Sequence, residues 1–105
     1  MASTPEGKVK VKVKLLLNKH DTYHFWPVQT GLGSRTLDCL GCHKGDMFAV
    51  ETKAPGQHPT ELQELIISEI ERSGGVVFVI GERATDDVYK YSGMEDLSRW
   101  LNRSK

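Results

Sequence analysis

An acidic and a basic residue stand two positions apart at the end of an apolar stretch, FAVETKAPG, at residues 48–56. The apolar residues predict a buried strand, and side chains alternate across a strand. Glu51 and Lys53 therefore share one face, and Thr52 points to the other. Because a buried charge is costly unless a partner offsets it, this strand predicts either a functional pair or an exposed edge strand.

A second carboxylate lies on the segment that precedes this strand. The stretches 36–42, TLDCLGC, and 47–53, MFAVETK, are joined by four turn-forming residues and predict a β-hairpin. Paired strands lie about 5 Å apart, so the carboxylates of Asp38 and Glu51 can converge. Two hard oxygen ligands predict a site for Mg²⁺ or Mn²⁺, and the backbone carbonyl of Thr52 could add a third oxygen.

Lys53 would lie beside such a metal. A lysine there can orient or deprotonate a water molecule and balance charge on a scissile phosphate. A metal acting as a Lewis acid, together with an activated water, is the apparatus of phosphodiester hydrolysis. The spacing alone equally supports an alternative, in which Glu51 and Lys53 are exposed on an edge strand and Asp38 caps a turn.

The elements around these residues predict an α/β protein. Residues 60–73 form the clearest helix, because Thr60 and Gln63 match a capping box. Its apolar face would comprise Leu62, Leu65, Ile66 and Ile70.

Two strands and a second helix complete the pattern. We expect strands at 22–28 and 76–80, a loop at 29–35, and a closing helix with a capping box formed by Ser92 and Glu95. This order of elements favours a central mixed β-sheet flanked by helices.

The segment 3–21 is ambiguous. Val9, Val11, Val13, Leu15 and Leu17 recur at every second position, with lysine between them as far as residue 15, which slightly favours a strand. Thr4, Pro5 and Glu6 instead suit the first turn of a helix.

The stretch LDCLGCHKGDMFAVETKAPGQHPTELQ, residues 37–63, resembles the VRR-NUC family of the PD-(D/E)XK nuclease superfamily. The superfamily pattern is an acid on one strand and Glu-x-Lys on the next, and Asp38 and Glu51-Thr52-Lys53 match it. The resemblance runs from residue 5 to residue 80 and implies a single nuclease domain over residues 1–105 with a restriction-endonuclease-like core. It also implies that Asp38 and Glu51 bind Mg²⁺, for which Mn²⁺ can substitute, and that Lys53 is catalytic.

Two further residues match the family. Gln63 corresponds to a helix glutamine near the site, and Glu6 to an acid on a first helix, which implies that residues 5–20 are helical and that Glu6 is a metal ligand. Both have a purely structural alternative, because Gln63 suits a capping box and Glu6 suits a helix N-terminus. Leu37 departs from the family, which usually has proline before the metal-binding aspartate.

The charge distribution is compatible with DNA despite a formal net charge of zero. Residues 1–53 carry eight basic and five acidic side chains, and the remainder carries six and nine. A polyanion could therefore dock on the first half. The candidate DNA-binding residues are Lys8, Lys12, Arg35 and Lys44.

The two cysteines allow other readings. CLGCH at residues 39–43 matches a haem attachment pattern, but we expect no haem because that reading leaves ETKAPG without a role. Cys39 and Cys42 could be a redox pair, or could bind zinc with His43 or His58, although no second cysteine pair exists. We expect Cys39 to pack in the core and Cys42 to lie near the hairpin turn.

Localisation follows from what the sequence lacks. No apolar run approaches the roughly 18 residues of a membrane span, and residues 1–10 lack the apolar core of a signal peptide. We therefore expect a cytoplasmic protein without membrane contact, located in the host cytoplasm if it is phage-encoded.

The sequence thus predicts a metal-dependent DNA endonuclease. One active site cuts one strand, and a C₂ dimer would present two opposed sites to a symmetric branched substrate. The resemblance implies the same, since stand-alone members are typically homodimers acting on four-way junctions in replication or repair. We expect the dimer contact at the run 15–17 of the first helix. The alternative is a catalytically inactive DNA-binding or structural module of the same fold.

Overall fold

The computed structural model describes residues 4–28, 35–54, 56–82 and 91–104. Its elements are α1 (Pro5–Lys19), β1 (Tyr23–Phe25), β2 (Cys39–His43), β3 (Asp46–Lys53), α2 (Glu61–Arg72), β4 (Val76–Glu82), β5 (Tyr91–Ser92) and α3 (Met94–Asn102). The expected loop at 29–35 lies outside these residues, except for Arg35.

The five strands form one mixed sheet in the order β1-β2-β3-β4-β5. β1, β2 and β3 pair antiparallel, β3 and β4 pair parallel, and β4 and β5 pair antiparallel. The parallel pair requires a crossover, which α2 supplies. The expected α/β fold with a mixed sheet flanked by helices is confirmed, while the short β5 was not predicted.

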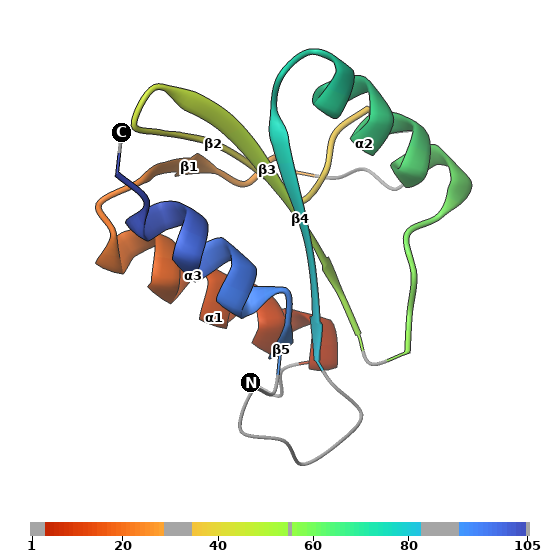
Figure 1. The fold of residues 1–105 in the computed structure, drawn as a ribbon. Coiled ribbons are helices and arrows are strands. Elements are labelled where there is room, and N and C mark those ends of the chain that lie inside the picture. Colours follow the sequence, from red (N-terminus) through yellow and green to blue (C-terminus); the bar gives the residue numbers. More distant parts are fainter. Residues whose placement is uncertain (1–3, 29–34, 55, 83–90, 105) are drawn as a thin grey trace.

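The helices lie on both faces of the sheet (Figure 1). α1 and α3 lie side by side over one face, and α2 covers β3 and β4 on the other. β3 sends alternate side chains into both layers: Phe48 and Val50 join the core under α1 and α3, and Ala49 joins the core under α2. The same alternation places Glu51 on the α2 face and Thr52 on the α1 face.

α1 is helical, so the strand favoured by alternation is wrong and the helix implied by the family resemblance is confirmed. The Thr4 side chain accepts a hydrogen bond from the Gly7 amide at 2.9 Å, which caps the helix. Val9, Val13 and Leu17 recur every four residues and are fully buried, and each contributes about 1.5–3 kcal/mol by burial. Capping and this buried row therefore prevail over the local alternation.

α3 begins differently from the prediction. Its N-cap is Gly93, in a left-handed conformation with φ of 88°, and no side chain caps it. The predicted capping box of Ser92 and Glu95 is therefore wrong, because the residue at position 92 ends β5. Trp100 anchors the helix, with its ring centroid 5.3 Å from that of Phe48.

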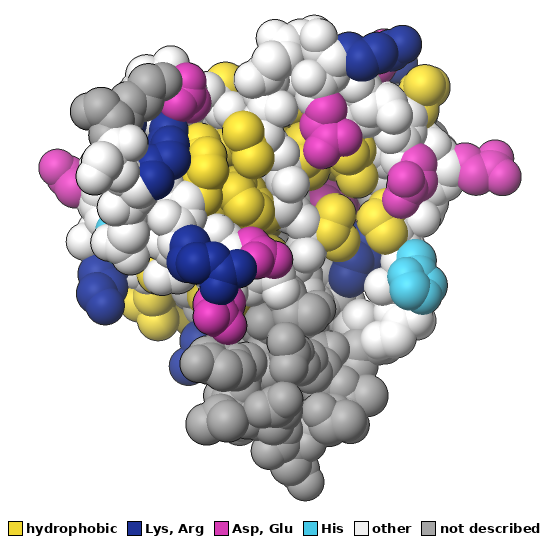
Figure 2. Space-filling view, in the orientation of Figure 1, with side chains coloured by type: hydrophobic (Ala, Val, Ile, Leu, Met, Phe, Trp, Pro, Cys, Tyr) yellow, Lys and Arg dark blue, Asp and Glu magenta, His cyan; other side chains and the backbone are white. Residues whose placement is uncertain are grey.

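The apolar face predicted for α2 is only half correct. Ile66 is buried and Ile70 packs beside it, but Leu62 and Leu65 are 39% and 51% exposed. Figure 2 shows apolar side chains reaching the surface on either side of β4. Among the described residues, no helix combines the length and the apolar character needed to cross a membrane.

Candidate active site

The Glu51–Lys53 pair lies at the carboxyl end of β3, where β4 pairs with the strand as far as Lys53 and the pairing with β2 ends at Val50. Glu51 is only 2% exposed, and the Lys53 ammonium lies 3.5 Å from its Oε2 atom. The edge-strand alternative would have left both side chains in solvent, whereas the Lys53 side chain is only 12% exposed. The edge-strand alternative is therefore wrong, and the two charges share a buried face.

Asp38 lies one residue before β2 rather than on the strand itself. Its Oδ2 atom accepts hydrogen bonds from the Thr52 amide at 2.8 Å and the Thr52 hydroxyl at 2.7 Å. Its backbone N–H donates to Oε1 of Glu51 at 3.3 Å. Asp38 therefore binds directly to the end of β3, which brings both predicted carboxylates to one place.

The Glu51 carboxylate is unusually basic. Burial, and secondly the negative charge of Asp38, raise the pKa of Glu51 from 4.5 to about 7, against the opposing effect of Lys53. Desolvation and a neighbouring like charge both disfavour the ionised carboxylate. Such perturbed groups concentrate at functional sites.

Gln63 links α2 to this pair. Its side-chain N–H donates to Oε2 of Glu51 at 2.9 Å, and its Oε1 atom accepts from Lys53 at 2.6 Å. The same side chain closes the capping box, since its Oε1 also accepts from the Thr60 amide at 2.9 Å. The structural and the site role of Gln63 thus coexist: the cap fixes the amide that holds the two charged groups.

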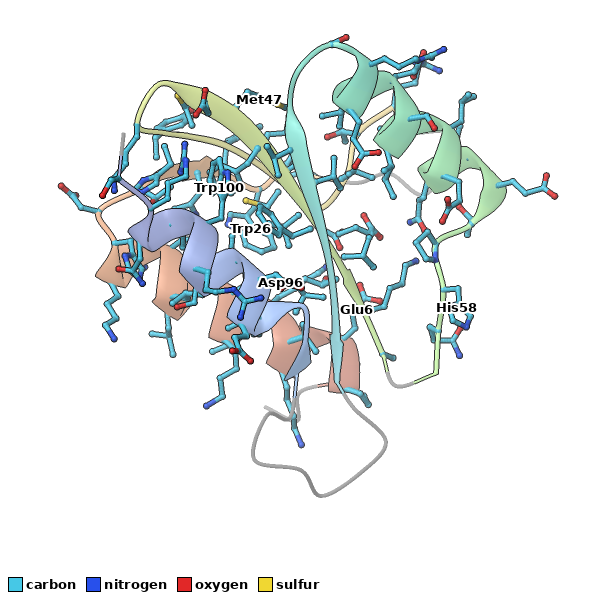
Figure 3. All side chains as sticks on the ribbon, viewed as in Figure 1. Glu6, Trp26, Met47, His58, Asp96 and Trp100 are labelled. Atoms are coloured by element: carbon cyan, nitrogen blue, oxygen red, sulfur yellow. The ribbon has the colours of Figure 1, made fainter. Side chains whose placement is uncertain are left out.

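Glu6 reaches the site only through a neighbour. In Figure 3 the labelled Glu6 lies at the start of α1, near the end of β3. Its carboxylate lies 3.5 Å from the Lys10 ammonium, which lies 3.8 Å from Oδ1 of Asp38. Lys10 is not among the candidate site residues chosen from the sequence. The i,i+4 spacing of Glu6 and Lys10 was the available signal, but it appears only once the segment is known to be helical.

The four candidate DNA-binding residues do not surround the carboxylates. Lys10 is the α1 lysine that approaches Asp38. Lys12 and Lys8 are each two residues from Lys10, so both lie on the opposite side of the helix, about 200° away. Lys44 occupies the β2–β3 turn, where its ammonium binds the carbonyl of Arg103. Seven residues separate it from Glu51, roughly 20 Å along the strand.

Arg35, the fourth candidate, is paired within the protein. Its guanidinium binds the carboxylate of Glu69 on α2. Glu69 lies six residues beyond Gln63, about 9 Å along the helix. Arg35 therefore lies to one side of the carboxylates.

The donor set fits a hard divalent cation. Asp38 and Glu51 supply carboxylate oxygens at the end of β3, and the Thr52 backbone carbonyl belongs to the same stretch. Within the described part of the chain, no three His, Cys, Asp or Glu side chains gather as a complete metal site. Mg²⁺ suits such a set, because it keeps several waters and needs only one or two carboxylates. A cation here would also counteract the burial and the negative charge of Asp38, which raise the pKa of Glu51.

The cysteines do not converge. Cys39 is fully buried, and burial raises the pKa of its thiol to about 12. Cys42 is exposed, and both cysteines are free. Their positions differ by three residues on β2, so their side chains point to opposite faces. The expected packing of Cys39 and placement of Cys42 are confirmed.

His43 is buried, and both of its ring nitrogens contact polar groups of the protein. Its Nδ1 atom lies 2.9 Å from the Thr22 hydroxyl, and its Nε2 atom lies 2.8 Å from the Leu101 carbonyl. A carbonyl only accepts, so Nε2 donates to Leu101 while Nδ1 is within hydrogen-bond distance of Thr22. Both ring nitrogens are therefore engaged, which does not suit a metal ligand.

A cavity of about 250 Å³ opens beside Lys53, lined also by Gln57, His58, Pro59 and Val79. Figure 3 places His58 on the segment that joins β3 to α2. A larger cavity of about 630 Å³ lies at the other end of β3, against Asp46 and Met47. The smaller cavity is the better candidate for substrate access, because Lys53 of the charged cluster lines it.

No model of a known protein family matches this chain, and a search of curated proteins finds no match either. The resemblance to the VRR-NUC family therefore stays a prediction, and the case for a function rests on the cluster of Asp38, Glu51, Lys53 and Gln63.

Proposed function

We propose that this protein is a metal-dependent DNA endonuclease with a restriction-endonuclease-like core. The observation that carries the proposal is the buried cluster at the end of β3: one carboxylate on β3 and one just before β2, with Lys53 held against Glu51 by Gln63. A structural ion pair does not need a second carboxylate and a bridging amide at the same strand end.

Asp38, Glu51 and the Thr52 carbonyl would hold Mg²⁺, or Mn²⁺ in its place. The bound ion supplies Lewis acidity toward a phosphoryl oxygen and lowers the pKa of a coordinated water. The Asp38 oxygen that Thr52 anchors keeps that carboxylate aligned with the end of β3. Glu6 is a weaker candidate ligand, because its carboxylate pairs with Lys10.

Lys53 has the catalytic role. Its ammonium can orient the attacking water and balance the charge that accumulates on the phosphate. The hydroxyl of that water bonds to phosphorus, the bond from phosphorus to one sugar oxygen breaks, and that oxygen takes the proton. Gln63 is a positioning residue, because it holds both Lys53 and Glu51.

The substrate we propose is branched DNA, with a four-way junction preferred, cut by a homodimer in the cytoplasm. The dimer contact expected at 15–17 needs correction, because Leu17 is fully buried and Leu16 packs against the core. Val11 and Leu15, one turn apart, are 52% and 60% exposed on the outer face of α1. They supply the apolar surface that a dimer contact needs.

A side-by-side assay tests the substrate and the assembly. The protein in Mg²⁺ is offered a four-way junction and a linear duplex of equal sequence, while light scattering gives its mass. We expect a dimer that cuts the junction faster. A monomer that cuts both equally would keep the nuclease and remove the junction preference, whereas DNA binding without any cleavage would support the inactive module.

A further inference from the structure

Lys10 stands between two acidic groups at the edge of the cluster. Its ammonium lies 3.5 Å from a Glu6 oxygen and 3.8 Å from Oδ1 of Asp38. The exposures of the partners differ: the Lys10 side chain is 37% exposed, and that of Asp38 is 9% exposed. A partly exposed cation therefore faces a nearly buried carboxylate.

The two oxygens of Asp38 have different surroundings. Oδ2 receives both the amide and the hydroxyl of Thr52, so the protein fixes it. Oδ1 is the oxygen that Lys10 approaches. A divalent cation held on the Oδ1 side would lie within a few ångströms of the ammonium, where two positive charges repel strongly.

The other lysines that the structure describes near the cluster have other positions or partners. Lys53 is only 12% exposed in its side chain and is held by Glu51 and Gln63. Lys14 lies over the Trp26 ring, 4.8 Å from its centroid. Lys12 faces the opposite edge of α1.

We propose that Lys10 is a displaceable counter-ion of Asp38. Its ammonium balances the buried carboxylate while no metal is bound, and it moves outward to a backbone phosphate of the substrate when a divalent cation occupies the site. The flexible four-carbon stem of lysine permits this movement, and phosphates attract the released ammonium. The inference rests on the proposed metal-dependent function and adds a residue that is not among the candidate site residues chosen from the sequence.

Metal titration without DNA tests whether Lys10 balances the charge of Asp38 in the metal-free protein. Mn²⁺ is titrated by calorimetry into the wild type, Lys10→Met, Lys10→Arg and the control Lys19→Met, at an exposed residue in the last turn of α1, each checked for folding by its melting curve. Because a partly exposed ion pair is modest in strength, we expect Lys10→Met to bind Mn²⁺ about fivefold more tightly. Lys10→Arg should stay near the wild type, since it keeps the charge, and Lys19→Met should be unchanged.

DNA binding tests whether Lys10 contacts a backbone phosphate once the metal is bound. In a Lys53→Ala background with Mg²⁺, adding Lys10→Met should weaken binding and reduce the salt dependence by about one phosphate contact. Unchanged or weaker Mn²⁺ binding in Lys10→Met, or an unchanged salt dependence, would overturn the inference.

The outcomes separate this inference from the proposed function. Cleavage by the wild type with no effect of Lys10 on Mn²⁺ binding would defeat the inference alone. The expected Lys10 effects without cleavage by the wild type would defeat the nuclease alone. If neither the wild type nor Lys10→Met binds Mn²⁺, both fail.

Discussion

Replacing Glu51 with glutamine should stabilise the metal-free protein at pH 8, although it removes a buried group from the candidate active site. Burial and the charge of Asp38 raise the pKa of Glu51 from 4.5 to about 7. One pKa unit corresponds to about 1.4 kcal/mol, so the ionised side chain opposes folding by about 3 kcal/mol above pH 7. Glutamine removes this cost but places an amide N–H toward the N–H of Asp38 or of Gln63, which loses one hydrogen bond worth about 1 kcal/mol. The net gain is about 2 kcal/mol.

The sign of this effect depends on pH. Between pH 4.5 and 7 the folded protein keeps a proton on Glu51 that the unfolded chain has released. Stability therefore falls as pH rises through this window, and the full penalty is present above it. At pH 5 the penalty is small while the hydrogen-bond loss remains, so the substitution should be neutral or destabilising there, and its effect should change sign between about pH 5 and 6.

Urea unfolding of metal-free protein at pH 5 and pH 8 measures both effects. Glu71→Gln, which neutralises an exposed residue of the same helix that carries Gln63, is the matched control and should change stability by less than about 0.5 kcal/mol at either pH. A Glu51→Gln variant that is destabilised equally at both pH values would refute the reasoning, because it would show that the folded protein tolerates the Glu51 charge. Adding Mg²⁺ at pH 8 should stabilise the wild type more than Glu51→Gln.

Three further predictions concern metal binding, the cysteines and assembly. Lys53→Ala should keep Mn²⁺ binding within about threefold, since lysine is not a ligand, while Asp38→Ala should weaken it at least about tenfold; calorimetric titration that finds the reverse order would exchange their roles. Cys39→Ser should cost about 1–3 kcal/mol in urea unfolding because it buries a hydroxyl in an apolar core, and Cys42→Ser should be neutral, with Mg²⁺-dependent cleavage kept in both; stoichiometric zinc in the wild type that is lost with either variant would contradict a packing role. Leu15→Glu should shift the light-scattering mass from dimer to monomer without unfolding the chain. A variant that stays dimeric would show that the dimer contact does not include Leu15.

The sequence predicts the centre of the site better than its edge. Glu51 and Lys53 share a face because strand alternation requires it, and the capping-box spacing placed Gln63 at the start of α2. Both are local rules that tertiary context did not override. Asp38 was placed on a strand instead of just before it, an error within the usual uncertainty of element ends.

The missed contacts depend on tertiary packing. Lys10 could not be assigned from the local pattern, because alternation slightly favoured a strand over α1 and the two periods place different lysines together. The hydrogen bonds from Thr52 to Asp38 arise because the residue before β2 reaches across to β3, which no single-segment pattern encodes. The exposed Leu62 and Leu65 show that periodicity gives a helix an apolar stripe without showing how much of that stripe the sheet covers.

Cleavage of a labelled four-way junction by the purified wild type, Lys53→Ala and Lys19→Ala, with Mg²⁺ and with a chelator, tests the central claim most directly. Lys19 is exposed at the last turn of α1, about 13 Å along the helix from Lys10, and serves as the control. We predict cleavage by the wild type and Lys19→Ala in Mg²⁺, and loss of cleavage in the chelator and in folded Lys53→Ala. Cleavage that persists in folded Lys53→Ala, or a wild type that binds Mn²⁺ and DNA yet cuts neither junction nor duplex, would contradict a hydrolytic role for this cluster.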